Sequence, residues 1–275
     1  MPDKSRIDVT VATLNNARTI KHCLQAIHDY VPLGTIVVVD GGSVDGTLEI
    51  ANEFNVRIVH EKGLLGQVRY RQAQASETEW IAYVDSDIYL YPNWWSEVSR
   101  HIDDPEVGMV LGFCDLELRG LPEYDSFLKY RARKFGTEAF SNTLIKRQLV
   151  LECKNPLKKV HAGEDSVVAR HIKESGLRIV TIPKLLCFHD KNIIESHPRA
   201  YYRSGKSIRL SDGAIGVYRM TNSLMAIIRD WFAFSKDNQT YSLALLTYLC
   251  KLWLCMVLGY LSTLDLANRT SIRGK

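Results

Sequence analysis

The chain has 275 residues, 46% of them hydrophobic and 24% charged, a composition that excludes a disordered or low-complexity protein. A formal net charge of +4, from 35 basic and 31 acidic residues, is too small to indicate nucleic-acid binding, and we expect none. A mean hydropathy of −0.12 excludes a protein with many membrane spans, although such an average leaves room for one apolar segment.

The six cysteines and the N-terminal residues both bear on the compartment of the protein. Neither a CxxC pair nor a histidine at zinc-finger spacing accompanies the cysteines, so we expect reduced thiols and no structural zinc site. The first residues carry Asp3, Lys4 and Arg6 and no apolar signal region. These features favour a catalytic part on the cytoplasmic side.

Strand-like and helix-like segments alternate over the first 190 residues, which is typical of a parallel sheet covered by helices. Asn15 and Asn16 are predicted to form a turn and helix cap before a first helix, in which Ile20, Cys23, Leu24 and Ile27 recur at helical spacing. A second helix is predicted at residues 67–75. Buried strands are predicted at residues 7–13, 36–39, 56–59 and 80–84.

Two of these strands end in turns that carry carboxylates. Asp40-Gly41-Gly42-Ser43 follows the second strand, and Asp85-Ser86-Asp87 follows the fourth. Asp and Gly are ordinary turn residues, so either turn alone has a simple structural explanation. Because open parallel sheets bind ligands at the carboxyl ends of their strands, the two turns together favour a ligand site. Asp85 and Asp87 point the same way on an extended strand end and can share one Mg²⁺ or Mn²⁺.

Four motifs, in this order, resemble those of the family 2 glycosyltransferases. They are Val11-Ala12-Thr13-Leu14-Asn15-Asn16, Val39-Asp40-Gly41-Gly42-Ser43-Val44-Asp45-Gly46-Thr47, Asp85-Ser86-Asp87 and Gly163-Glu164-Asp165. The resemblance covers roughly residues 6–209 and implies an inverting enzyme with the glycosyltransferase A-type fold. That fold is an α/β domain with a mostly parallel, Rossmann-like central sheet flanked by helices. The resemblance does not identify a substrate.

The resemblance also implies roles for residues that bind the nucleotide sugar. Asp40 is expected to hydrogen-bond the base, with Thr13 lining the same pocket. Arg71 falls where the family usually has Ala-Arg-Asn and is expected to face the nucleotide. Two departures, Ala12 for a frequent proline and Gln72 for a frequent asparagine, affect details of the pocket and remove no charge.

The remaining implied roles concern the metal and the reaction. Asp85 is expected to reach the ribose or the metal, Asp87 to be the principal metal ligand, and His189 to add a further metal or diphosphate contact. In the Glu164-Asp165 pair, Asp165 is expected to be the general base and Glu164 to contact the nucleotide sugar. An alternative for this pair is a helix N-terminus whose acids suit the helix dipole, and an alternative for His189 is a structural histidine.

The chemistry of sugar transfer agrees with this division of roles. The departing diphosphate needs its charge neutralised, which Mn²⁺ or Mg²⁺ can do. The incoming hydroxyl needs a base on the opposite face of the sugar. A single base with no candidate nucleophile opposite it fits one direct displacement and therefore inversion. We expect a UDP- or GDP-sugar as the donor.

The composition changes after about residue 212, which predicts a catalytic domain at residues 1–215 and an apolar helical extension at 216–275. Residues 241–264 are long enough to cross a bilayer and contain one charge, Lys251. Aromatic and basic residues precede them, an amphipathic pattern suited to a membrane interface. Three arrangements remain open: a single span, a hairpin in the membrane plane, or a helix packed on protein. Four basic residues share one side of the helix before the break: Arg199, Arg203, Lys206 and Arg209.

These features predict a metal-dependent inverting glycosyltransferase on the cytoplasmic side of the cell membrane, attached peripherally or by one segment. The acceptor is expected to be lipid-linked or a growing glycan. Residues 112–159 are expected to shape its site, and their basic residues are Arg131, Arg133, Lys134, Lys146 and Arg147. The alternatives are a nucleotidyltransferase and a non-catalytic nucleotide-sugar-binding scaffold at the membrane.

Overall fold

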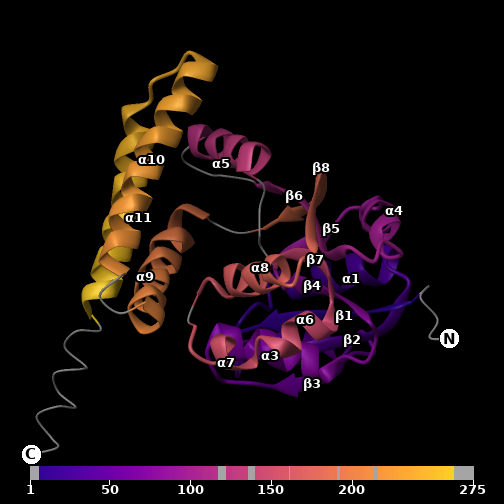
Figure 1. Ribbon diagram of the computed structural model, residues 1–275. Helices are drawn as coiled ribbons and strands as arrows, with labels where there is room; N and C mark the ends of the chain where they lie inside the picture. The colour runs from indigo at the N-terminus through magenta and orange to yellow at the C-terminus, as the bar shows by residue number, and fades with distance from the viewer. Residues whose placement is uncertain are drawn as a thin grey trace, which may run out of the picture. The chain divides into compact units, whose positions relative to one another are not determined.

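The computed structural model describes residues 6–116, 122–135, 140–160, 162–190, 193–212 and 216–262. The chain divides into two compact units (Figure 1). The sheet unit consists of Met1–Leu116, Gly136–Lys158 and Glu164–Lys191. The helical unit consists of Glu117–Phe135, Lys159–Gly163 and Asn192–Lys275.

One mixed sheet forms the centre of the sheet unit, with the strand order β3-β2-β1-β4-β7-β6-β8-β5. Its described strands are β1 Ile7–Thr13, β2 Leu33–Asp40, β3 Arg57–His60, β4 Trp80–Asp85, β5 Ile88–Leu90, β6 Val107–Leu116, β7 Asn142–Lys146 and β8 Arg178–His189. Neighbours from β3 to β4 pair in parallel, as do β6 and β8, whereas β7 and β5 pair antiparallel to their neighbours. The prediction of a mostly parallel sheet is therefore confirmed, with antiparallel strands that the sequence analysis did not assign.

The four strands predicted from the sequence, β3, β2, β1 and β4, lie side by side in the sheet. Ile36 to Val39 in β2 and Ile81 to Val84 in β4 are buried, so both faces of these strands are covered. Helices provide this cover on the two faces of the sheet (Figure 1). They are α1 Ile20–Tyr30, α2 Thr47–Ala51, α3 Leu65–Ala75, α4 Trp94–Val98, α6 Arg147–Glu152, α7 Lys154–Leu157 and α8 Glu164–Glu174, with a 3₁₀ turn at Ser99–His101.

The described part of the helical unit consists of α5 Pro122–Phe135, α9 Ile193–Asp212, α10 Gly216–Asn238 and α11 Leu243–Ser262. The last two form a hairpin, and α9 packs along α11 (Figure 1). Two glycines allow the backbones of α9 and α11 to touch. A Cβ on Gly205 would meet the carbonyl oxygen of Met256, and one on Gly259 would meet that of Tyr202.

A charged group is buried within this unit and paired there. The carboxylate of Asp230 on α10 lies 3.1 Å from Arg131 Nε of α5 and 2.9 Å from Arg229 Nη2. Among the described helices, α11 is the one that is long and apolar enough to cross a membrane by length and composition. The last two residues of the predicted apolar segment, 263 and 264, lie outside the described residues.

Candidate functional site

The two predicted carboxylate turns lie at one edge of the sheet. In the parallel register, Thr13 at the end of β1 is beside Asp40 at the end of β2. On the other side of β1, Ala12 is beside Asp85 at the end of β4. The carboxyl ends of three neighbouring strands therefore bring Thr13, Asp40 and Asp85 together, at the edge where open parallel sheets bind ligands.

Asp40 is almost completely buried and is held by the turn that follows it. Its Oδ1 accepts hydrogen bonds from Ser43 Oγ at 2.6 Å and from the Ser43 N–H at 3.0 Å, and its Oδ2 accepts one from the Gly42 N–H at 2.9 Å. Gly42 has a φ of 102°, a left-handed conformation that favours glycine. Burial by itself raises the pKa of Asp40, but the bonds from Ser43 and Gly42 outweigh it and lower the pKa. Asp40 is therefore a fixed, ionised acceptor.

The hydroxyl oxygen of Thr13 also lies at this edge. Its Oγ1 is buried and has no hydrogen-bond partner within the described part of the chain. Buried hydroxyls are normally bonded, so such an atom calls for an explanation. A ligand group placed between the ends of β1 and β2 would supply the missing partner.

Arg69 is a buried cation between two of the predicted site carboxylates. Its Nη2 donates to Asp85 Oδ1 at 2.7 Å, and its Nε lies 3.5 Å from Glu164 Oε1. The guanidinium also lies 5.5 Å from the ring centroid of Phe140 and 5.8 Å from that of Tyr83. Burial lowers the pKa of Arg69, but the charges of Asp85 and Glu164 outweigh this and raise it, so the side chain stays charged. Arg69 thus joins the end of β4 to the start of α8.

The sequence analysis selected Arg71 and not Arg69 from the same helix. Arg71 is half-buried and has no ion pair or hydrogen bond with another described residue. Two residues apart on a helix point in very different directions, so both arginines cannot face the sheet. Arg69 lies on the buried side of α3, together with Val68, Gln72 and Ala73. A charged residue among the buried positions of a helical pattern is the signal that could have identified Arg69. A nucleotide contact by Arg71 stays a prediction.

Asp87 and His189 meet where β5 and β8 pair. The side chains approach to 3.4 Å between Asp87 Oδ2 and His189 Nε2, and the Asp190 N–H donates to the Asp87 carbonyl at 2.8 Å. Asp190 accepts further bonds from Arg18 at 2.9 Å and from Tyr89 Oη at 2.7 Å. These contacts, which the sequence did not reveal, anchor the strand end that carries His189.

A carboxylate beside an imidazole is a suitable ligand pair for a divalent cation. Two neighbouring ligands of an octahedral ion with bonds of about 2.1 Å lie about 3 Å apart, close to the Asp87–His189 separation. Mg²⁺ is commonly held by one or two protein groups together with substrate phosphates. No cluster of three or more such ligands occurs among the described residues. Asp87 and His189 therefore fit a metal that is shared with a diphosphate. The third predicted ligand, Asp85, has its Oδ1 bonded to Arg69.

The predicted general base lies at the beginning of a helix. Asp165 is half-buried in the first turn of α8, and its Oδ1 accepts a hydrogen bond from the Ser166 N–H at 2.7 Å. A negatively charged side chain is favoured at the positive end of the helix dipole. The position of Asp165 therefore agrees both with the predicted base and with the alternative, a helix N-terminus whose acids suit the dipole. Glu164, its neighbour, is buried against Arg69, which fixes the start of α8 beside Asp85.

The basic residues predicted for the acceptor site do not form one cluster. Arg131 belongs to the helical unit, where it pairs with Asp230. Lys146 and Arg147 belong to the sheet unit and donate to the backbone carbonyls of Pro105 and Ala73. The side chains of Arg133 and Lys134 lie outside the described residues, as do residues 117–121 and 136–139 of the same segment.

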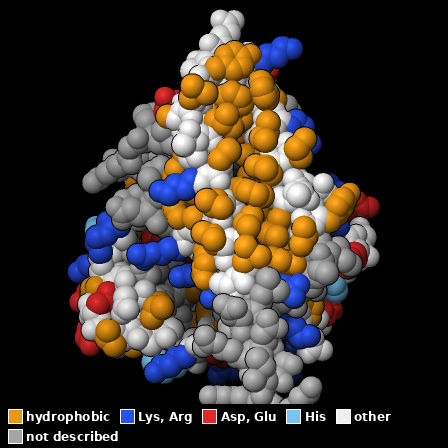
Figure 2. All heavy atoms as spheres, turned by 90° about the vertical axis from the view of Figure 1, so that its left-hand side faces the viewer, with side chains coloured by type: hydrophobic (Ala, Val, Ile, Leu, Met, Phe, Trp, Pro, Cys, Tyr) orange, Lys and Arg blue, Asp and Glu red, His pale blue; other side chains and the backbone are white. Residues whose placement is uncertain are grey.

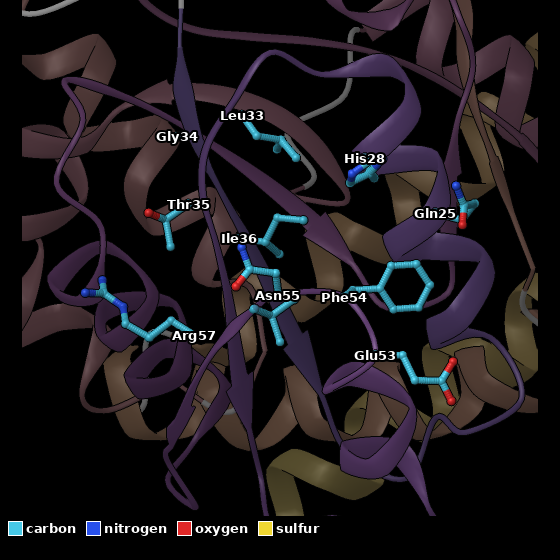
Figure 3. A pocket seen from close by; sticks show the side chains of 11 residues that line it. Gln25, His28, Leu33, Gly34, Thr35, Ile36, Glu53, Phe54, Asn55 and Arg57 are labelled. Carbon is cyan, nitrogen blue, oxygen red and sulfur yellow. The ribbon is translucent and has the colours of Figure 1, made fainter.

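A hollow of about 870 Å³ lies at the opposite edge of the sheet, where β2 and β3 begin (Figure 3). Leu33, Ile36 and Phe54 contribute apolar side chains to it, and Glu53 and Arg57 contribute charged ones. At about 3.3 Å per residue, the length of β2 separates this hollow from Asp40 by roughly 20 Å. It is therefore not part of the carboxylate edge.

Known proteins are similar to this chain in sequence and in fold. The model of the family described as glycosyl transferase family 2 matches residues 8–154. Glucosyl-3-phosphoglycerate synthase of Petrotoga mobilis is 28% identical over 131 residues, which are 42% of this chain and 40% of that protein. The chain spans between a quarter and two fifths of the length of the curated relatives it matches.

Two solved structures show the same fold at low sequence identity. A mannosyltransferase from Pyrobaculum calidifontis, in complex with GDP-Man and Mn²⁺, is 17% identical with a TM-score of 0.61, over 95% of this chain and 89% of that one. Glucosyl-3-phosphoglycerate synthase from Mycobacterium tuberculosis, in complex with phosphoglyceric acid, is 17% identical with a TM-score of 0.55, over 74% of this chain and 79% of that one.

Proposed function

Because the chain belongs to glycosyl transferase family 2, we propose that it is a nucleotide-sugar-dependent glycosyltransferase that inverts the configuration of the sugar that it transfers. In this proposal a UDP- or GDP-sugar donates its sugar by direct displacement to a hydroxyl or phosphate acceptor. The observation that carries the proposal is the meeting of Thr13, Asp40, Asp85 and Arg69 at one sheet edge. The start of α8, with Asp165, is tied to that edge through Arg69 and Glu164.

The donor binds at the ends of β1, β2 and β4. Asp40 is a fixed, ionised acceptor suited to an N–H of the base. Thr13 Oγ1 beside it, which has no hydrogen-bond partner among the described residues, suits a second polar group of the nucleotide. The ribose reaches Asp85, whose carboxylate is oriented by Arg69. Arg71 and Glu164 complete the predicted contacts to the nucleotide sugar.

Asp87 and His189, with the second oxygen of Asp85, would hold Mn²⁺ or Mg²⁺ against the diphosphate. When bound, the cation neutralises the charge of the leaving nucleoside diphosphate. The pairing of β5 with β8 keeps the two protein ligands together, since Ile88 is opposite His189 in the antiparallel register. Asp190, anchored by Arg18 and Tyr89, resists movement of that strand end.

Asp165 accepts the proton of the acceptor hydroxyl as the hydroxyl oxygen attacks the sugar carbon. The bond from that carbon to the diphosphate breaks in the same step, so one displacement inverts the configuration. General-base assistance of this kind contributes about 10²–10⁴-fold to the rate. Asp165 Oδ1 accepts a hydrogen bond from the Ser166 N–H, which orients the carboxylate at the start of α8.

The acceptor is a lipid-linked molecule or a growing glycan at the cytoplasmic side of the cell membrane. The apolar helix α11 and the basic residues of α9 support a membrane location for the enzyme. Attachment through the helical unit would leave the sheet unit to bind a donor that is soluble in water.

A panel of nucleotide sugars tests the reaction class. The purified protein is incubated with each UDP- or GDP-sugar, with Mn²⁺ or with a chelator, in the presence of membrane extract as an acceptor source. We expect release of nucleoside diphosphate that needs the metal and an inverted anomeric product. Release of pyrophosphate would indicate nucleotidyl transfer. Donor binding by calorimetry without any release, across the full panel, would indicate a non-catalytic scaffold.

A further inference from the structure

Exposed apolar side chains are concentrated on the helical unit. Of the twelve large apolar side chains that are exposed among the described residues, nine belong to this unit. They are Val217, Tyr218, Met225, Phe232, Tyr241, Leu243, Leu254, Leu258 and Leu261. Figure 2 shows apolar side chains in a continuous band over the α10–α11 hairpin. Contiguous apolar patches on a surface mark sites of interaction with proteins or membranes.

Helix α11 is apolar on both of its sides. Its inner side consists of Leu245, Leu249, Leu252, Met256, Gly259 and Tyr260, which are buried. Its outer side includes Leu243, Leu254, Leu258 and Leu261, each of them about half exposed or more. A surface helix of a water-soluble protein normally presents polar residues on that side. The outer side of α11 therefore suits an apolar surrounding.

The charges on the outer sides of the hairpin are positive. Lys236 and Lys251 are exposed there, in line with Met225 and Phe232 on α10 and with the leucines of α11, whereas the exposed Arg229 is paired with Asp230. Asp237 at the end of α10 is the one exposed acid on the described parts of the two helices, since Asp230 is buried. Exposed aromatic and aliphatic residues mixed with Lys and Arg are typical of helices that bind anionic membrane surfaces.

The packing of α9 opposes a transmembrane position of α11. About twenty residues are needed to cross the hydrocarbon core, so nearly the whole of α11, which has 20 residues, would have to lie within it. The backbone of α9 touches α11 through Gly205 and Gly259, so α9 would accompany it. The basic side chains of α9 would then enter the hydrocarbon: Arg199 and Arg203, which are exposed, and Lys206 and Arg209, which are half-buried. Cations at that depth are costly.

We infer that the α10–α11 hairpin is a docking surface for an anionic lipid membrane and that it lies in the plane of the interface without crossing it. Phe232, Met225 and the outer leucines of α11 enter the acyl boundary, and Lys251 extends its charged end toward the headgroups. This inference rests on the proposed function, which places the acceptor at a membrane. It adds the surface, the lipid charge and the orientation of the helices.

Flotation of the full chain with vesicles tests the docking surface. We expect binding to phosphatidylcholine vesicles that contain phosphatidylglycerol, and weaker binding to phosphatidylcholine alone or at high salt. F232E/L258E should lower the bound fraction at least about tenfold, since binding scales with the apolar area inserted. L185E, at an exposed leucine of β8, is the matched control and should bind as the unchanged protein does. Both sites are exposed, so circular dichroism should report unchanged folding.

Two results would overturn the docking surface. The first is an absence of flotation with either lipid. The second is a stable dimer in solution that F232E/L258E converts to a monomer, which would make the band an interface between two copies of the chain. Nucleoside diphosphate release separates this inference from the proposed function. A protein that releases it without floating contradicts the docking surface alone, whereas one that floats without releasing it contradicts the proposed function alone.

Depth measurements test the orientation. In a C250S/C255S background, an environment-sensitive fluorophore is placed in turn at Leu243, Leu254 and Leu261, and quenching by lipids labelled at known depths is recorded. A helix in the interface plane should give similar, shallow depths at all three positions. A probe at Leu254 that lies much deeper than those at the two ends would show a spanning helix and overturn the in-plane arrangement.

Discussion

The two units of this protein use charge and apolar surface in opposite ways. The sheet unit contains charged groups in its interior, where Arg69 lies between Asp85 and Glu164 and where Asp40 is held by its own turn. The helical unit exposes apolar groups on its exterior, along the outer sides of α10 and α11. Both are departures from an ordinary soluble domain, which buries apolar groups and exposes charged ones.

Each departure carries a cost in stability that a stable fold has to offset. Buried charges are tolerated when they are paired, and exposed apolar groups are tolerated when a partner surface covers them. In the sheet unit the partners are present within the chain. In the helical unit the partner that we infer is a membrane. Both exceptions to the usual pattern lie where we propose that this protein binds its donor and a membrane.

The largest effect is expected at the proposed general base, Asp165. Asp165→Asn should lower the rate of transfer by about 10²–10⁴-fold, since the acceptor proton loses its base. Donor affinity should change little because the side chain acts on the acceptor. Steady-state kinetics and calorimetric titration of the donor measure the two quantities. Glu174→Gln at the exposed end of the same helix is the control and should leave both unchanged. Near-normal transfer by Asp165→Asn would remove this residue from the mechanism.

The next effect concerns the stability of the sheet unit. Arg69→Met leaves the carboxylates of Asp85 and Glu164 without their buried cation and should lower the free energy of unfolding by about 3 kcal/mol. Arg71→Met on the same helix removes no ion pair and should change it by less than about 0.5 kcal/mol. Urea denaturation of the two variants measures the difference. Equal losses would show that Arg69 does not stabilise the carboxylate edge.

The metal ligands provide a third test. Asp87→Asn should weaken the binding of Mn²⁺ in the presence of donor by at least about 10–100-fold. Loss of a residue that only supports a metal ligand already lowers metal affinity by that factor. Donor binding measured with a chelator present should stay the same for the variant and the unchanged protein. Titration of Mn²⁺ by electron paramagnetic resonance reports the free ion directly. Asp103→Asn, in the turn between the 3₁₀ turn and β6, is the control. Unaltered metal affinity in Asp87→Asn would place the cation elsewhere.

The smallest effect is a pH dependence at Asp40. Its pKa is lower in the folded protein than the usual value of 3.8, so its hydrogen bonds stabilise the fold above that pH. This contribution is lost as the pH falls through the lower, folded-state pKa. We therefore expect Asp40→Asn to be less stable than the unchanged protein by about 1 kcal/mol at pH 7, with the gap closing below pH 4. Denaturation curves from pH 7 to pH 3 measure it, and a constant gap would contradict the assignment.

Local patterns in the sequence determined the centre of the fold and the type of its chemistry. The apolar runs of β2 and β4 and the β-branched run of β1 predicted buried strands, because a parallel sheet covered by helices on both faces needs such strands. The carboxylates that follow Val39 and Val84 predicted a ligand edge, because parallel strands carry their ends to the same side. Their resemblance to the family 2 glycosyltransferases indicated the enzyme class to which the chain belongs.

Only the tertiary structure decided which arginine reaches the carboxylates and what the apolar helix is joined to. Arg69 and Arg71 are the same residue type two positions apart, and the packing of α3 on the sheet selects the one that faces Asp85. Likewise, the hydropathy of α11 is compatible with a span or a surface helix. The contact of Gly205 with Met256 brings the basic helix α9 beside it. Composition and periodicity are properties of one segment, whereas a charge pair or a helix neighbour joins residues far apart in the chain.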